Sequence, residues 1–238
     1  MPYEQMDERQ VAAYLHMDQR ELHKLASRGQ VPCRKVRDGF VFYKGQVDHW
    51  VEAQMHRLGK ERLAGIEKGV RRHHGLAREG LLLWPLIPEG GIACPLRASS
   101  RDSVIRNLVK LADDAGLVYA KDELIAEVRK REELCSTALM PGLALPHPRH
   151  PLPYGIAASF VVVGLTTTGV PYGAADGSLT RLFFLLCSKD DRTHLHVLAR
   201  IGRMLHDQAQ IDELLTAGDA EELGAMILAK EEALPPEP

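Results

Sequence analysis

The side chains best suited to chemistry gather in one stretch of the chain, residues 131–149, which reads REELCSTALMPGLALPHPR. It holds an arginine, two adjacent hydroxyl groups and a histidine that follows a proline, namely Arg131, Ser136, Thr137 and His147. Imidazole titrates near neutral pH and serves as a nucleophile or metal ligand, whereas a guanidinium attracts anions. The stretch therefore indicates either group transfer at a histidine or metal binding.

Metal binding is the alternative chemistry, since His150, His194 and His196 accompany His147 in the same half of the chain. His194 and His196 lie two residues apart on a predicted helix, so they point in different directions, and no carboxylate or cysteine completes a ligand set. The chain has eleven histidines, so a Pro-His pair can arise by chance, and most single histidines are structural. We expect neither a metal ion nor a cofactor, and the sequence has no Walker-type glycine loop.

These residues follow the active-site pattern of a known family. The pattern is Arg-Glu, a few residues, Ser-Thr, and then Gly-Ile-Ala-aliphatic-Pro-His. Here it reads Arg131-Glu132, Ser136-Thr137 and Gly142-Leu143-Ala144-Leu145-Pro146-His147. A second block, RLFFLLCSKDDRTHLHVLARIGRML, has His194 at the start of a helix, as the family does. Residues 81–230 thus resemble enzyme IIA of the fructose/mannitol and nitrogen-regulatory type, from the bacterial phosphoenolpyruvate-dependent phosphotransferase system.

The resemblance implies a phosphotransferase component that accepts and donates a phosphoryl group through a histidine. His147 would be the phosphoryl acceptor, and His194 would lie beside it and hydrogen-bond the phosphate or the ring. Arg131 would supply positive charge, and Ser136 and Thr137 would offer hydroxyl and backbone donors. The implied partners are a histidine-containing phosphocarrier protein as donor and a IIB-type protein or a regulated protein as acceptor.

Strand-like and helix-like segments alternate around these residues from position 81 onward. Helices are predicted over residues 100–116 and 121–134, and strands over ASFVVVGL and RLFFLLCS. Such alternation favours an α/β fold with functional loops near strand ends. Together with the resemblance, it predicts an enzyme IIA-like α/β sandwich with a mixed sheet and helices on both faces.

The front of the chain carries a different pattern. Asp7 and Asp18 are predicted N-caps of two short helices, and Asp38-Gly39 marks a hairpin turn between two strand-like runs. A further helix, containing VDHW, follows the hairpin. The run resembles the excisionase-like winged helix-turn-helix family over about residues 5–52, and the resemblance implies a small DNA-binding domain.

Six basic residues of this segment are the candidate DNA contacts: Arg20, Lys24, Arg28, Arg34, Lys35 and Arg37. The first three recur at every fourth position and share one face of the second helix, while the other three lie on the first hairpin strand. The same stripe suits a solvated helix face, and two-helix units also dock proteins, but we favour DNA. Residues 1–50 carry 8 basic against 7 acidic residues, so tight binding would need a homodimer or a second contact.

Composition places the chain among globular proteins. Its 238 residues are 45% hydrophobic and 26% charged, which excludes wholesale disorder, collagen-like sequence and a disulfide scaffold. Four scattered cysteines without a CxxC pair indicate reduced thiols and a cytoplasmic location. No apolar run approaches the length of a membrane span, so we expect no membrane insertion.

Charge is divided unevenly along the chain. Residues 1–80 carry 15 basic and 11 acidic residues, whereas residues 81–238 carry 15 and 21. A basic front on an acidic body suggests two tasks in one chain. We predict a helix-turn-helix domain over residues 1–52, a basic, glycine-interrupted helical linker over 53–80 and an enzyme IIA-like domain over 81–238.

The leading hypothesis is a regulatory phosphocarrier coupled to a DNA-binding front domain. One alternative is a non-catalytic regulator whose IIA-like domain only docks a partner protein. The intact set of Arg131, His147, His194 and the two hydroxyl groups argues against it, since a pure docking surface needs none of them. Another alternative is a sugar-transport component whose front domain binds protein rather than DNA.

Overall fold

The computed structural model describes residues 4–15, 17–37, 39–54, 58–74 and 82–235. Contacts between residues divide the chain into two compact units. The first unit comprises Met1–Leu81, Leu195–Arg203 and Pro235–Pro238, and the second comprises Leu82–His194 and Met204–Leu234. The three-part domain division made from the sequence stays a prediction.

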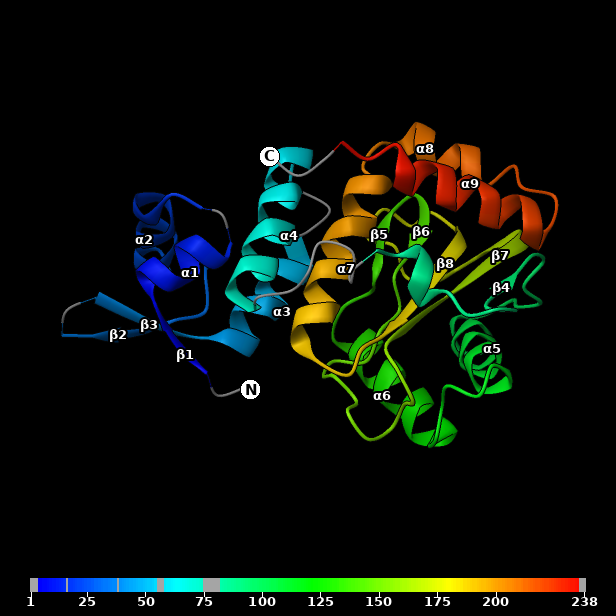
Figure 1. Cartoon of the computed structure of the whole chain (residues 1–238), viewed down its shortest axis with the longest axis horizontal. Helices are drawn as coiled ribbons and strands as arrows, with labels where there is room; N and C mark the ends of the chain where they lie inside the picture. The colour runs from blue at the N-terminus through cyan, green and yellow to red at the C-terminus, as the bar shows by residue number, and fades with distance from the viewer. Residues whose placement is uncertain (1–3, 16, 38, 55–57, 75–81, 236–238) are drawn as a thin grey trace. The chain divides into compact units, whose positions relative to one another are not determined.

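The second unit is built around a five-stranded mixed sheet (Figure 1). The strand order is β4-β7-β8-β6-β5, in which β7 and β8 are antiparallel neighbours, as are β5 and β6. β4 runs parallel to β7, and β6 runs parallel to β8. The strands are β4 (Ile92–Ala93), β5 (Ala138–Met140), β6 (Gly142–Ala144), β7 (Phe160–Val170) and β8 (Thr180–Cys187).

Strands β7 and β8 are apolar along most of their length, because both of their faces are buried. Side chains of α5 and α6 pack with Phe160 and Val162 of β7 and with Phe183 and Leu185 of β8 in one core. α8 contacts β6 and α9 contacts β4, and Figure 1 shows these two helices across the sheet from α5 and α6. The helices of this unit are α5 (Arg101–Asp114), α6 (Lys121–Leu134), α8 (Gln208–Leu214) and α9 (Ala220–Glu232), with a short 3₁₀ turn, η2, at Trp84–Leu86. Helix α7 (Asp191–Met204) begins in this unit, and its residues Leu195–Arg203 belong to the first unit.

This arrangement confirms the predicted mixed α/β architecture of the back of the chain. The predicted helices over 100–116 and 121–134 are α5 and α6, and α5 begins at a capping box between Ser100 and Ser103. Among the helices of the described ranges, none is both long and apolar enough to cross a bilayer.

The first unit contains a small antiparallel sheet and short helices. The sheet has the order β1-β3-β2. Asp7 caps α1 in a capping box with Gln10, and Asp18 caps α2, both as predicted. The predicted hairpin is β2–β3, although Asp38 at its turn lies outside the described residues. The elements are β1 (Gln5–Asp7), α1 (Glu8–Tyr14), α2 (Gln19–Ser27), β2 (Arg34–Val36), β3 (Gly39–Tyr43), α3 (Lys44–Gln54) and α4 (Lys60–His74).

Glycine plays another part in α4 than the sequence pattern suggests. The pattern predicts a broken or soft helix, and the structure has α4 running without interruption through Gly65 and Gly69. A Cβ atom at Gly69 would stand 2.2 Å from the backbone oxygen of Tyr14 at the end of α1. The absence of a side chain therefore lets α4 pack closely against α1, which outweighs the low helix propensity of glycine.

A buried polar cluster joins α1 and α3 of the first unit. Asp48 accepts hydrogen bonds from the Tyr14 hydroxyl at 2.8 Å and from the Lys44 ammonium at 2.6 Å. The Lys44 ammonium also lies over the Tyr14 ring, 5.0 Å from its centroid. Because all three side chains are buried, each charge depends on its partner for the solvation it has lost.

Breaking the Lys44–Asp48 ion pair should lower the free energy of unfolding far more than breaking an ion pair on the surface. We expect Asp48→Asn to lower the free energy of unfolding of the first unit by about 3 kcal/mol, because it leaves the Lys44 ammonium buried without a counter-charge. Asp114→Asn is the matched control, since Lys110 and Asp114 form an exposed ion pair with the same four-residue spacing.

Urea unfolding followed by the indole N–H signals of Trp50 and Trp84 checks this, because each unit holds one of the two tryptophans. Equal, small effects of Asp48→Asn and Asp114→Asn would contradict the stabilising role of the buried cluster.

Candidate active site

His147 lies just after β6 and is buried, with each of its two ring nitrogens in a hydrogen bond. Nδ1 is 2.7 Å from the backbone oxygen of Leu145, and Nε2 is 3.1 Å from Nε of Arg131. A carbonyl oxygen can only accept, so Nδ1 carries the proton, and Nε2 accepts from the arginine through its lone pair. The ring is therefore held in the tautomer whose nucleophilic nitrogen is Nε2.

Arg131 stands in the last turn of α6 and is buried. Besides its contact with His147, it donates through Nη1 to the backbone oxygen of Cys135 at 3.0 Å and approaches the Cys135 sulfur at 3.4 Å. Cys135 caps the carboxyl end of α6, where helix carbonyls carry partial negative charge. The guanidinium is thus anchored by the end of its own helix and aimed at the imidazole.

Glu132, the next residue of α6, fixes the loop that follows the helix. Its buried carboxylate accepts hydrogen bonds from the backbone N–H of Thr137 at 2.8 Å and from the Thr137 hydroxyl at 2.7 Å. The backbone oxygen of Thr137 in turn accepts from the N–H of Leu145 at 3.1 Å. A continuous chain of hydrogen bonds therefore runs from Glu132 through Thr137 and Leu145 to Nδ1 of His147.

His194 stands in the first turn of α7, beside His147. The two ring centroids are 5.0 Å apart with an interplanar angle of 62°, so the rings meet edge to face. The sequence predicts that His194 lies next to His147 and that Arg131 contributes charge, and the structure brings all three together. His194 is buried, as His147 is, and the two histidines come from segments 47 positions apart in the sequence.

The predicted hydroxyl residues have different surroundings. The Thr137 hydroxyl donates to Glu132, as described, whereas Ser136 donates to the backbone oxygen of Tyr172 at 3.4 Å and accepts from the N–H of Ala138 at 3.2 Å. Burial raises the pKa of the Tyr172 hydroxyl well above its usual range, and the Glu132 carboxylate adds to the shift. The Tyr172 hydroxyl is therefore neutral near pH 7.

Three contributors to the site are absent from the residues chosen by sequence: Glu132, Cys135 and the backbone of Leu145. Glu132 belongs to the Arg-Glu pair of the recognised pattern, so the sequence indicates its position. Its hydrogen bonds with Thr137 are known only from the structure. Cys187, by contrast, is a core residue, and burial raises the pKa of its thiol. Within the described ranges, no three histidine, cysteine, aspartate or glutamate side chains cluster to hold a metal ion.

The six basic residues of the first unit form a separate surface. Arg20 and Lys24 lie on α2, and Arg28 lies at its carboxyl end. Arg34 and Lys35 lie on β2, and Arg37 follows β2 directly. All six side chains are exposed. The Glu8 carboxylate accepts from the N–H of Phe40 in β3 at 3.2 Å and lies 3.0 Å from Nδ1 of His23 in α2. One α1 side chain therefore ties α2 and the hairpin together.

A mixed α/β unit with a buried histidine pair and an adjacent arginine holds the kinds of groups that phosphoryl transfer through a histidine uses. Residues 86–230 match the family "Phosphoenolpyruvate-dependent sugar phosphotransferase system, EIIA 2". That stretch is more than half of the chain, which therefore belongs to this family. The match does not extend to residues 1–85.

Two curated relatives illustrate the family. The mannitol-specific phosphotransferase enzyme IIA component of Staphylococcus aureus (strain MRSA252) is 27% identical over 139 residues, which cover 58% of this chain and 92% of that protein. The fructose-specific EIIABC component of Bacillus subtilis is 26% identical over 134 residues. These are 56% of this chain but 21% of that protein, so the chain spans only about a fifth of this larger relative.

Solved structures share the fold. The nitrogen regulatory protein IIA-Ntr from Neisseria meningitidis superimposes with a TM-score of 0.54 and 24% identity, over 60% of this chain and 97% of that one. Enzyme IIA mannitol from Escherichia coli, solved in complex with phosphorylated enzyme IIB mannitol, gives a TM-score of 0.51 and 20% identity. That likeness covers 59% of this chain and 95% of the matched one.

Removing the Glu132 carboxylate should loosen the loop that orients His147. We expect Glu132→Gln to lower the free energy of unfolding of the second unit by about 2 kcal/mol, because a buried charge-assisted pair of hydrogen bonds is lost. The ¹⁵N signals of the His147 ring should also move away from those of the Nδ1-protonated tautomer.

The neighbouring Glu133→Gln is the matched control, because Glu133 is exposed. Heat or urea unfolding and ring ¹⁵N spectra measure both effects. If Glu132→Gln and Glu133→Gln gave the same unfolding free energy and the same ring spectrum, the hydrogen-bond chain would have no role in orienting His147.

Proposed function

We propose that this chain takes a phosphoryl group onto Nε2 of His147 from a phosphorylated histidine-containing carrier protein and passes it to a IIB-type protein or a regulated protein. The observation that carries the proposal is the pair of hydrogen bonds on the His147 ring, which leaves the lone pair of Nε2 facing Arg131. The four free cysteines support the predicted cytoplasmic location.

The transfer needs one bond to form and one to break. The lone pair of Nε2 attacks phosphorus, a new N–P bond forms, and the N–P bond of the donor breaks with its electron pair returning to the donor ring nitrogen. His147 then carries positive charge on its ring, which the Nδ1–H shares with the backbone oxygen of Leu145. No proton has to move between the partners during this step.

Arg131 and His194 stabilise the transferring group. Phosphoryl transfer is catalysed chiefly by positioning and by positive charge against the equatorial oxygens. The Arg131 guanidinium, which donates to Nε2 before transfer, lies where it can donate to a phosphoryl oxygen bonded to that nitrogen. The His194 ring, 5.0 Å from that of His147, supplies a second polar group at the same oxygens.

A IIB-type acceptor follows from the relatives rather than from this chain alone. The likeness to an enzyme IIA solved with phosphorylated enzyme IIB supports the same kind of partner here. The two curated relatives are specific for mannitol and for fructose, so we assign a sugar phosphotransferase system without choosing a sugar.

Phosphorylation should be confined to one histidine. With phosphoenolpyruvate and the two general phosphotransferase proteins, we expect intact mass to show one acid-labile phosphate on the wild type and none on His147→Ala. His194→Ala should still accept phosphate, with a rate about a hundredfold lower because one stabilising group is lost.

His150→Ala is the matched control, since His150 is exposed three residues from His147, and it should behave as the wild type. A wild type that gains no phosphate would contradict the phosphocarrier function and favour a regulator whose IIA-like unit only docks a partner.

We further propose that the first unit binds DNA through the six exposed basic residues of α2 and the hairpin. The observation in favour is the Glu8 contact, which fixes α2 relative to β3 and so would let a helix and a wing bind one duplex together. Because the net charge of residues 1–50 is only +1, a single copy should bind weakly, and a homodimer would supply the second contact.

Charge removal on β2 should weaken DNA binding. We expect the double variant Arg34→Gln/Lys35→Gln to bind a duplex less tightly, and the slope of log affinity against log salt to fall by about 2 as two phosphate contacts are lost. The control is Arg106→Gln/Lys110→Gln, which removes the same charge from exposed positions on α5.

Fluorescence anisotropy with a labelled duplex at several salt concentrations measures both variants. Equal losses in the two double variants would mean that net charge alone attracts the duplex. No binding by the wild type would favour the alternative in which the front of the chain binds protein.

A further inference from the structure

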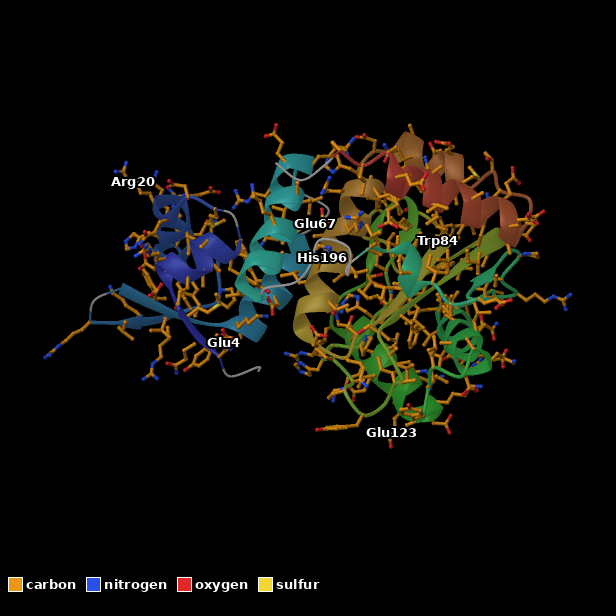
Figure 2. The ribbon with its side chains drawn as sticks, viewed as in Figure 1. Glu4, Arg20, Glu67, Trp84, Glu123 and His196 are labelled. Carbon is orange, nitrogen blue, oxygen red and sulfur yellow. The ribbon has the colours of Figure 1, made fainter. Side chains whose placement is uncertain are left out.

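A fully buried carboxylate outside the active site meets three ionisable side chains of α7. Glu67 of α4 forms ion pairs with Arg203 and with Arg200, the latter at 3.3 Å, and Nε2 of His196 lies 3.7 Å from its Oε1 atom. All four residues belong to the first unit, which includes Leu195–Arg203 of α7. Figure 2 marks Glu67 on α4 and His196 on α7.

This cluster fixes the position of α7 relative to α4, because buried charges depend on their partners for the solvation they have lost. Burial raises the pKa of Glu67, and the Arg203 and Arg200 guanidinium groups act in the opposite direction. Arg203 also donates to the backbone oxygen of Pro235 at 2.7 Å. Both arginines are therefore held by Glu67, and a displacement of the α7 segment would leave charge buried without its partner.

The same helix carries an active-site histidine. The segment of α7 that belongs to the first unit begins at Leu195, and the residue directly before it is His194. An α-helix transmits a shift or rotation along its backbone, because each turn is hydrogen-bonded to the next. Whatever holds the segment Leu195–Arg203 therefore also holds the His194 ring against that of His147.

We propose that Glu67 is a positioning residue for phosphoryl transfer, which holds α7 through Arg200, Arg203 and His196 and thereby sets His194 beside His147. This inference rests on the proposed phosphocarrier function. The coupling is reciprocal by thermodynamic necessity: if α4 biases the position of His194, a phosphoryl group on His147 biases the contacts of α4. The contacts of Glu67 with α7 are where that bias is expected in α4.

Glu67→Gln tests the positioning role, with Glu21→Gln as the matched control. Glu21 also pairs with an arginine of α4, Arg62, but the pair is partly exposed and does not involve α7. We expect the single-turnover rate of phosphorylation to fall about tenfold in Glu67→Gln, because His194 is misplaced. The carrier concentration at half-maximal rate should stay unchanged, and Glu21→Gln should match the wild type in both quantities.

Ring NMR signals provide a readout that general destabilisation would not give. In folded, unphosphorylated Glu67→Gln, we expect the ¹⁵N and ¹H signals of the His194 ring to shift, whereas those of the exposed His150 ring stay in place. Glu67→Asp, which keeps the charge, should restore most of the rate and of the His194 signals. Unchanged His194 signals and an unchanged rate in folded Glu67→Gln would overturn the inference.

If Glu67→Gln does not fold, amide hydrogen exchange of the wild type tests the inference. Amide exchange in α4 should change when His147 is phosphorylated, and unchanged protection around Glu67 would overturn the inference. If the wild type accepts no phosphate, the phosphocarrier function fails instead. The His194 ring signals of unphosphorylated Glu67→Gln, or of Glu67→Asp if only that variant folds, then still show whether Glu67 positions His194.

Discussion

The hydrogen bond from Nδ1 of His147 to the backbone oxygen of Leu145 decides which ring nitrogen carries the proton, and the contacts of Glu132 and Arg131 are built around it. A neutral imidazole has one protonated and one bare nitrogen, and only the bare nitrogen can attack phosphorus. The Glu132–Thr137 contact holds the backbone that accepts a hydrogen bond from Leu145, directly after β6. The end of α6 presents Arg131 to the nitrogen that remains.

Buried carboxylates with charged or hydroxyl partners recur in both units. Glu132 holds Thr137, Asp48 holds Lys44 and Tyr14, and Glu67 holds two arginines of α7. Such groups add little net stability compared with apolar packing, but they tolerate only one arrangement of their partners. Glu67 and Asp48 join segments distant in sequence, through Arg200 and Tyr14, whereas Glu132 fixes the loop directly after its own helix.

Much of the second unit could be predicted from sequence. The apolar runs of β7 and β8 and the amphipathic α5 indicate the α/β class, and the Arg-Glu, Ser-Thr and Pro-His pattern indicates the family. The roles of the individual site residues stay predictions, as does DNA binding by the first unit. The part that Gly69 plays could not be predicted, because a glycine within a helical pattern is equally consistent with a soft break and with a close helix contact.

The sequence by itself determined the reactive groups and their order along the chain, because residue types and local spacing dictate helices, caps and the recognised pattern around His147. The tertiary structure alone decided which groups meet: His194 with His147, Glu132 with Thr137, and Glu67 with α7. The His147–His194 and Glu67–α7 contacts join segments far apart in the chain, and the Glu132–Thr137 contact joins the end of α6 to the loop that follows it, so all three depend on how the chain packs. Packing depends on burial and steric fit across the whole core, which no local pattern encodes.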